Sequence, residues 1–225
     1  MNNLAAYWFL ENFDFMRKLG KSNLMKLCDI LEMEQFRKGE TIHYVKASEN
    51  RVIFLKKGSV KIVDSVTNTV KYLVKEGNIF GELDIPEIGE QQRQGEEHSV
   101  CLEDVVVCYL TTAQMQGVMD NYPSLKNHVI KIQSFRIKKL ERRLSDLLYK
   151  TSEERIFEFI ISYVKEHGIK NAKSYSIKNK LTHLDIANLT NTSRQTVNNV
   201  ISTLRTRGLI EYSRKLISIP DEPKA

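Results

Sequence analysis

The stretch that decides the fold lies near the C-terminus, where residues 182–219 are THLDIANLTNTSRQTVNNVISTLRTRGLIEYSRKLISI. Thr182 and Asp185 have the spacing of a capping box, which predicts the start of a first short helix. Asn191 stands where the chain must turn sharply, and asparagine adopts a left-handed backbone more readily than most residues other than glycine. A second helix is predicted to begin at Ser193. The stretch therefore predicts two helices joined by a tight turn.

The second predicted helix ends at Gly208 and is followed by two short strands around a basic turn, at 209–212 and 216–219. A helix of this kind fits the major groove of DNA, and side chains in its first turn reach base edges. Arginine pairs with guanine and glutamine with adenine through two hydrogen bonds each. A polar helix face is often only solvated, so the prediction depends on the complete arrangement of helix, turn, helix and basic hairpin. The predicted base contacts are Arg194, Gln195 and Asn199, and the predicted phosphate contacts are Thr182, Ser193, Arg214 and Lys215.

Charge is distributed unevenly along the 225 residues, which carry a net charge of +6. Residues 1–125 contain 14 Lys and Arg against 18 Asp and Glu, whereas residues 126–225 contain 20 against 10. A basic C-terminal half behind a mildly acidic N-terminal half suggests that only the C-terminal half meets a polyanion. A solvated basic helical surface explains the charge alone equally well.

The N-terminal half is predicted to be a β-sandwich or barrel. Short apolar runs recur at 52–55, 60–63, 71–74 and 105–110, and glycines punctuate them at 39, 58, 77 and 81. Strands at such regular intervals are typical of closed or two-layered antiparallel folds. The first thirty-odd residues are predicted to be helical, and the polar segment 86–97 is predicted to be an exposed loop.

A long helix is predicted from 124 to 149, followed by another that begins at the capping-box pair Thr151 and Glu154. A narrow heptad stripe along the long helix is typical of a coiled-coil contact with a second copy. The alternative is that the helix packs on its own barrel, for which Val129, Ile132 and Phe135 form a second apolar face. The predicted dimer seam comprises Ile130, Gln133, Ile137, Leu140, Leu144 and Leu147.

Several classes of protein are disfavoured by the sequence. No run approaches the ~18 apolar residues of a membrane span, and the first ten residues lack the basic start of a secretory signal. The three cysteines, Cys28, Cys101 and Cys108, are too few and too widely spaced for a disulfide framework and suit a reducing, cytoplasmic location. We find no paired nucleophile and base, no metal-ligand spacing and no phosphate-binding glycine loop. An enzyme and a metal site are therefore not expected.

These motifs resemble those of the CRP/FNR transcription regulators. The run Ser193-Arg194-Gln195-Thr196-Val197, with Leu204 and the run 208–210 (GLI), is similar to the recognition-helix signature of that family. The runs 36–40 (FRKGE), 55–60 (LKKGSV) and 77–83 (GNIFGEL) resemble its cyclic-nucleotide-binding-type barrel. The resemblance covers nearly the whole chain. It implies double-stranded DNA and RNA polymerase as partners, a homodimer, and a barrel that holds an effector.

The resemblance also implies where an effector would bind. In nucleotide-binding members a Gly-Glu pair contacts the ribose, and an Arg-Ser or Arg-Thr step holds the cyclic phosphate. Here His98 replaces that arginine, and a mostly neutral imidazole does not offer the same charged, two-pronged grip. A cyclic nucleotide is therefore disfavoured, and no cofactor is assigned. The effector pocket implied by the resemblance comprises Gly81, Glu82, Leu83, His98, Ser99, Leu140 and Glu141.

Other interpretations of the barrel stay open. The Gly81-Glu82 pair can instead serve only a turn of the barrel, and haem ligation by His43, His98, Cys101 or Cys108 is a further alternative. Cys28 alone near the N-terminus is too little for an iron–sulfur cluster. Cys101 and Cys108 are candidates for oxidation sensing, although nothing in the sequence indicates a lowered thiol pKa.

The sequence thus predicts an α+β protein: an N-terminal double-stranded β-helix or jelly-roll barrel, a long dimerisation helix and a C-terminal winged helix-turn-helix. The predicted domains are 1–123 for the effector barrel, 124–150 for the dimerisation helix and 151–225 for DNA binding. The function expected is a sequence-specific DNA-binding regulator. The alternative is a small-ligand sensor whose basic half docks a protein partner, but such a docking helix would more often expose apolar anchors.

Overall fold

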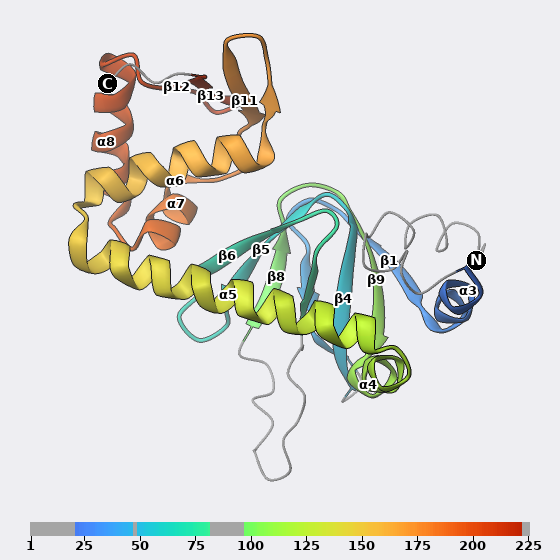
Figure 1. Cartoon of the computed structure of the whole chain (residues 1–225). Helices are drawn as coiled ribbons and strands as arrows, with labels where there is room; N and C mark the ends of the chain where they lie inside the picture. Colours follow the sequence, from blue (N-terminus) through green and yellow to red (C-terminus); the bar gives the residue numbers. More distant parts are fainter. Residues whose placement is uncertain (1–20, 47–48, 82–96, 222–225) are drawn as a thin grey trace. The chain divides into compact units, whose positions relative to one another are not determined.

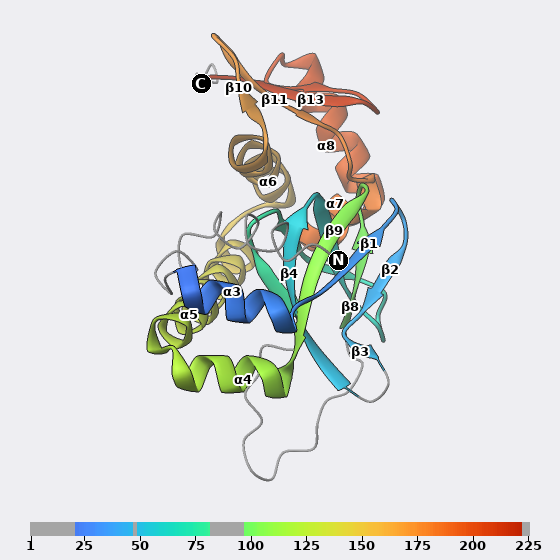
Figure 2. The same ribbon diagram turned by 90° about the vertical axis from the view of Figure 1, so that its right-hand side faces the viewer.

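The computed structural model describes residues 21–46, 49–81 and 97–221. It forms two compact units, residues 1–138 and 139–225 (Figures 1 and 2). The longest helix, α5 (Pro123–Tyr149), runs through the point of division and contributes to both units. Within the described ranges, no helix combines the length and apolar character that a membrane span requires.

The first unit contains two antiparallel sheets, which confirms the predicted jelly-roll class although the sheets do not close into a single barrel. One sheet has the order β1-β9-β4-β3, with β7 also paired to β4, and the other has the order β2-β8-β5-β6. The strands of the first sheet are β1 (Glu32–Phe36), β3 (Val45–Lys46), β4 (Glu49–Lys57), β7 (Ile79–Gly81) and β9 (Val105–Thr111). Those of the second are β2 (Thr41–His43), β5 (Ser59–Asp64), β6 (Val70–Lys75) and β8 (Glu97–Cys101).

Strand β4 is apolar without alternation because both of its faces are buried. Side chains alternate between the two faces of a strand. Ile53 and Leu55 pack into the core between the sheets, whereas Val52 and Phe54 belong to a second core on the opposite face. The predicted strands at 52–55, 60–63, 71–74 and 105–110 fall within β4, β5, β6 and β9 and are confirmed.

The second core of this unit lies between three helices and the outer face of β4 and β9 (Figure 2). The helices are α3 (Lys21–Ile30), α4 (Thr112–Asn121) and the first turns of α5. Leu125 and Val129 of α5 are buried here, so the start of the long helix is anchored on the sheet. Residues 1–20 of the predicted N-terminal helical segment lie outside the described residues, as does most of the predicted loop 86–97, of which Glu97 instead begins β8.

The second unit is a winged helix-turn-helix. Helix α6 (Ser152–His167) packs against α7 (His183–Thr190) and α8 (Arg194–Thr206). A four-stranded sheet, with the order β10-β11-β13-β12, completes the unit. Its strands are β10 (Ile169–Lys170), β11 (Ser174–Lys178), β12 (Glu211–Tyr212) and β13 (Leu216–Pro220).

The predicted helices of this unit are confirmed, including the capping boxes at Thr151 and Thr182. The predicted hairpin is confirmed as the pair β12 and β13, but its first strand begins at Glu211 rather than at 209. Strands β10 and β11 were not predicted. Strand β11 pairs with β13, about forty residues further along the chain.

Candidate nucleic-acid interface

Helix α7 is fixed at both ends by local hydrogen bonds. The Thr182 hydroxyl accepts from the backbone N–H of Asp185, 3.1 Å away, and the Asp185 carboxylate accepts from the backbone N–H of Thr182, 2.8 Å away. At the other end Asn191 is left-handed, with φ 52° and ψ 55°, and its N–H donates to the carbonyls of Ala187 and Asn188. The predicted left-handed turn residue is confirmed, and it places the start of α8 immediately after α7 ends.

Helix α8 has one buried and one exposed face, as a recognition helix requires. Its N-cap is Ser193, whose hydroxyl accepts from the N–H of Thr196, 3.0 Å away. With about 100° between successive helical residues, the apolar residues fall on one side and the polar residues on the other. The buried face consists of Val197, Val200, Ile201 and Leu204. All three predicted base-contacting side chains, Arg194, Gln195 and Asn199, are exposed on the other side.

The predicted phosphate-contacting residues lie around this exposed face. The Thr182 and Ser193 hydroxyls are engaged in the helix caps, while their residues remain exposed at the starts of α7 and α8. Helix N-termini carry unpaired N–H groups and the positive end of the helix dipole, which favour phosphate. Arg214 and Lys215 are exposed at the tip of the β12–β13 hairpin. Ser213 shapes that tip, because its hydroxyl accepts from the N–H groups of Lys215 and Leu216.

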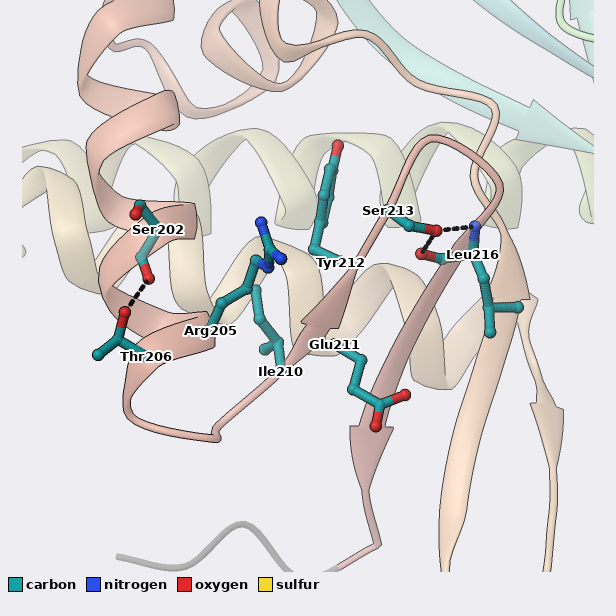
Figure 3. A pocket seen from close by; sticks show the side chains of 8 residues that line it. All are labelled: Ser202, Arg205, Thr206, Ile210, Glu211, Tyr212, Ser213 and Leu216. Carbon is teal, nitrogen blue, oxygen red and sulfur yellow. Dashed lines mark hydrogen bonds between the residues drawn. The ribbon is translucent and has the colours of Figure 1, made fainter.

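A groove of about 600 Å³ separates the second half of α8 from the hairpin (Figure 3). The Arg205 side chain extends from α8 towards Tyr212 across this groove (Figure 3). Arg205 was not predicted as a site residue. It follows Arg194 by eleven positions, or about three helical turns, so helical spacing alone would have placed both on one face. The lining residues are Ser202, Arg205, Thr206, Ile210, Glu211, Tyr212, Ser213 and Leu216.

His183 is a second residue of this surface that was not predicted as a site residue. Its Nδ1 is hydrogen-bonded to the side-chain oxygen of Asn198 on the exposed side of α8. Its ring also contacts the ring of Tyr212 in the hairpin, with a centroid distance of 5.4 Å. One side chain at the start of α7 thus touches both the recognition helix and the wing.

In the first unit, the predicted effector residues of β8 point to opposite sides of the sheet. Ser99 is fully buried and its hydroxyl is hydrogen-bonded to that of Tyr44, 2.7 Å away. Burial raises the pKa of Tyr44 well above its usual value, so this pair is uncharged. His98 lies on the other side of β8, where its Nδ1 is 3.0 Å from the Ser65 hydroxyl. Partial burial, and then the neighbouring His43, lower the pKa of His98 below its usual value.

Gly81 is required by the sheet itself. Its φ is +92°, and a Cβ at this position would lie 2.5 Å from the carbonyl oxygen of Arg51. The glycine therefore allows β7 to approach β4, whether or not a ligand binds. The neighbouring site residues Glu82 and Leu83 lie outside the described residues.

An arginine side chain does reach strands β6 and β7, but it comes from α5 rather than from β8. Arg136 donates through Nη2 to the carbonyl of Ile79, 3.2 Å away, and its guanidinium carbon is 5.4 Å from the centre of the Tyr72 ring. Arg136 was not predicted as a site residue. The remaining predicted effector residues, Leu140 and Glu141, are exposed on the part of α5 that belongs to the second unit.

The predicted dimer seam is a row of exposed apolar side chains on α5. Four of them are more than half exposed: Ile130 at 52%, Ile137 at 57%, Leu140 at 65% and Leu144 at 60%. Leu147 is 36% exposed and Gln133 is partly buried. Monomeric proteins rarely expose a continuous apolar stripe of this kind. Among the described residues, no group of three or more potential ligand side chains is arranged to hold a metal ion.

Comparison with known proteins matches both units. Residues 33–122 match the cyclic nucleotide-binding domain, and residues 142–224 match the Crp-like helix-turn-helix domain. The chain is 28% identical to the global nitrogen regulator of Synechococcus elongatus over 90% of both chains. It is 21% identical to the CRP-like cAMP-activated global transcriptional regulator of Mycobacterium tuberculosis, again over 90% of both. Its fold is similar to that of a CooA mutant from Carboxydothermus hydrogenoformans, with 17% identity, a TM-score of 0.69, and coverage of 88% of this chain and 86% of the other.

Proposed function

Since the chain belongs to the CRP/FNR family of DNA-binding transcription regulators, we propose that it binds a two-fold symmetric operator as a homodimer. Two copies of α8 would enter successive major grooves about 34 Å apart. The observation that carries this proposal is the exposed polar face of α8: Gln195 and Asn199 lie opposite the apolar buried face, and Arg194 is exposed at the edge of the polar face in the first turn. Like these relatives, it is a transcription regulator and not an enzyme.

Base reading is assigned to the first turns of α8. Arg194 offers two donors to guanine O6 and N7, and Gln195 and Asn199 can each pair with adenine N6 and N7. Thr182, Ser193, Arg214 and Lys215 are assigned to phosphates, which fix the register of the protein on the duplex. This division predicts different consequences for the two sets: loss of base preference for the first and a weaker salt dependence for the second.

Dimerisation is assigned to the exposed seam of α5, in a parallel arrangement of the two helices. The apolar residues Ile137, Leu140 and Leu144 are exposed in one chain and would be removed from water by a second copy. In this scheme residues 1–123 form the effector domain, 124–150 the dimerisation helix and 151–225 the DNA-binding domain. We further propose a cytoplasmic location and contact with RNA polymerase at the promoter.

The effector itself is not assigned, and cyclic AMP is disfavoured. A cyclic phosphate needs a charged, two-pronged donor such as arginine. His98 lies on the outer side of β8, has a lowered pKa and so is mostly neutral near pH 7. Ser99, which does face the interior, is already paired with Tyr44.

The function is tested by selecting random duplex DNA with the purified protein, with and without cyclic AMP. Enrichment of a palindrome in both arms is the expected result, because it identifies a DNA reader that does not need this nucleotide. Enrichment only with cyclic AMP would overturn the argument from His98. Enrichment in neither arm would contradict direct operator binding under these conditions and favour a sensor that acts through a protein partner.

The assignment of Arg194 is tested on the selected palindrome. Arg194→Ala should weaken binding by roughly 1–3 kcal/mol per half-site and relax the preference at one base pair. Arg207→Ala is the matched control, because Arg207 is also exposed but lies at the end of α8 and pairs with Glu153 of α6. Unchanged affinity and base preference in Arg194→Ala would show that α8 does not read DNA through this residue.

A further inference from the structure

Two arginines from different helices converge on the C-terminal end of α7. Arg143 of α5 donates through Nη2 to the carbonyl oxygen of Asn188, 2.8 Å away. Arg155 of α6 donates through Nε to the carbonyl of Thr190, 3.1 Å away, and through Nη2 to the carbonyl of Asn191, 3.3 Å away. The last turn of α7 and the following turn residue are therefore held by two guanidinium groups.

The chemistry of a helix end explains why cations bind here. The last carbonyl groups of a helix have no partner within the helix, and they carry the negative end of the helix dipole. A guanidinium presents several N–H donors in a rigid plane, so one side chain can bind two or three carbonyls at fixed angles. Arg155 uses this capacity fully, whereas a lysine in its place would offer one point charge on a flexible stem.

Arg155 also binds the junction between α5 and α6. Its Nη1 donates to the carbonyl of Lys150, 2.7 Å away, and its Nη2 lies 3.3 Å from the hydroxyl of Ser152. The same guanidinium thus joins the end of the long helix, the start of α6 and the turn of the helix-turn-helix. In contrast, the ion pair between Lys139 of α5 and Glu166 of α6 is 3.9 Å long and exposed, so it contributes little to this arrangement.

Arg143 stands beside the exposed seam of α5. It follows Leu140 by three residues and precedes Leu144 by one, so it flanks the stripe without belonging to it. Arg143 is half-buried, while Leu140 and Leu144 are at least 60% exposed. The end of α7 is thereby fastened to the flank of the helix, and the stripe itself stays open to a second copy.

We propose that Arg143 and Arg155 are positioning residues that fix the orientation of the helix-turn-helix on α5, and thereby set the half-site spacing that the dimer accepts. This inference rests on the proposed function as a DNA-binding dimer. In such a dimer each recognition helix is placed by its own α5, so any freedom between α5 and α7 becomes freedom in the distance and angle between the two recognition helices.

The test uses the full-length protein and the palindrome that the wild type selects, together with duplexes in which one base pair is inserted at or deleted from the centre. One base pair changes the separation of the half-sites by about 3.4 Å and their relative rotation by roughly 35°. The measured quantity is the ratio of the affinity for the parent spacing to that for each altered spacing. We expect Arg143→Ala to lower this ratio about tenfold and Arg155→Ala to lower it at least as much.

Two controls separate positioning from other roles. Arg142→Ala removes the exposed arginine next in the chain and should leave the ratio unchanged. Arg143→Lys keeps a cation able to reach one carbonyl and should restore part of the discrimination. A phosphate contact would appear instead as a smaller salt dependence at every spacing, so the slope of affinity against salt should stay that of the wild type in Arg143→Ala.

The outcomes are distinguishable. Relaxed spacing in Arg143→Ala but not in Arg142→Ala supports the proposal, and wild-type discrimination in Arg143→Ala overturns it. If Arg155→Ala does not fold, as judged by circular dichroism, Arg155→Lys replaces it, because the lysine keeps the charge but loses the multiple carbonyl bonds. Failure of the wild type to select any palindrome would refute the proposed function itself, and the positioning role with it.

Discussion

Truncating one residue of the dimer seam should weaken dimerisation by a free energy that follows from the exposure of that residue in the single chain. Leu140 is 65% exposed in the single chain. Complete burial of a leucine side chain contributes about 1.5–3 kcal/mol, so burying the exposed part contributes roughly 1–2 kcal/mol per copy. A symmetric dimer contains the residue twice. Leu140→Ala should therefore weaken dimerisation by about 2–4 kcal/mol, which raises the dissociation constant roughly 30- to 700-fold.

The chain provides a matched control for this change. Phe135 is 67% exposed on the same helix, but it lies outside the heptad stripe of Ile130, Ile137 and Leu144. With about 100° per residue, Phe135 faces well away from the centre of that stripe. Phe135→Ala removes at least as much exposed apolar surface as Leu140→Ala and should leave the dissociation constant unchanged.

Sedimentation velocity over a dilution series measures both constants without DNA. A stripe that only covers the protein's own surface would give equal, small effects for Leu140→Ala and Phe135→Ala. That result would refute the coiled-coil interpretation of α5. An effect of Leu140→Ala that is confined to the thermal stability of the chain, with the dimer unchanged, would refute it as well.

Three further predictions concern the interior and the turn. Partial burial, and then His43, lower the pKa of His98, so the unfolded chain binds a proton at His98 at a higher pH than the folded chain does. The contribution of the neutral His98 to stability is complete above about pH 6.5 and is lost as the pH falls below it. The melting temperature of His98→Gln, measured between pH 5 and 8, should therefore fall less towards acid pH than that of the wild type. Burial, and then nearby acidic side chains, raise the pKa of Cys101 to about 12, and burial raises that of Cys108 to about 11. A thiol reagent at pH 8 should therefore react with neither cysteine until the protein unfolds. Fast labelling of Cys101 or Cys108 in the native protein would contradict this. Asn191 has a positive φ of 52°, so Asn191→Ala should destabilise the second unit by about 1–2 kcal/mol in denaturant unfolding, whereas Asn191→Gly should cost less.

The parts of the fold that could be predicted from the sequence are those determined by residues close together in the chain. The capping boxes at Thr151 and Thr182 and the left-handed Asn191 are local signals, and the structure places all three as predicted. Strands β10 and β11 gave no such signal, because they are short and mostly polar and Ile177 is their one buried side chain. Their pairing depends on β13, so no window of adjacent residues contains it.

The same distinction applies to the candidate site: local spacing places some of its residues, and contacts between distant segments place the others. Helical spacing alone is enough to place Arg194, Gln195 and Asn199 on an exposed face of α8. The contact of His183 with Asn198 depends instead on how α7 crosses α8, and fifteen residues separate the partners. Arg155 is a stronger example, since its partners at Lys150 and Thr190 are backbone carbonyls and leave no trace in the side-chain pattern.

The carbonyl contacts of Arg143 and Arg155 matter because of where α5 lies in the chain. Among the described elements, α5 alone belongs to both units. Its start is fixed in the core of the first unit by Leu125 and Val129, and Arg143 near its end holds the last turn of α7. A helix of 27 residues is about 40 Å long. Within the second unit, α7 is held to the end of α5 and to its junction with α6 by Arg143 and Arg155, so the proposed positioning role assigns the orientation of the recognition helix on α5 to these two side chains.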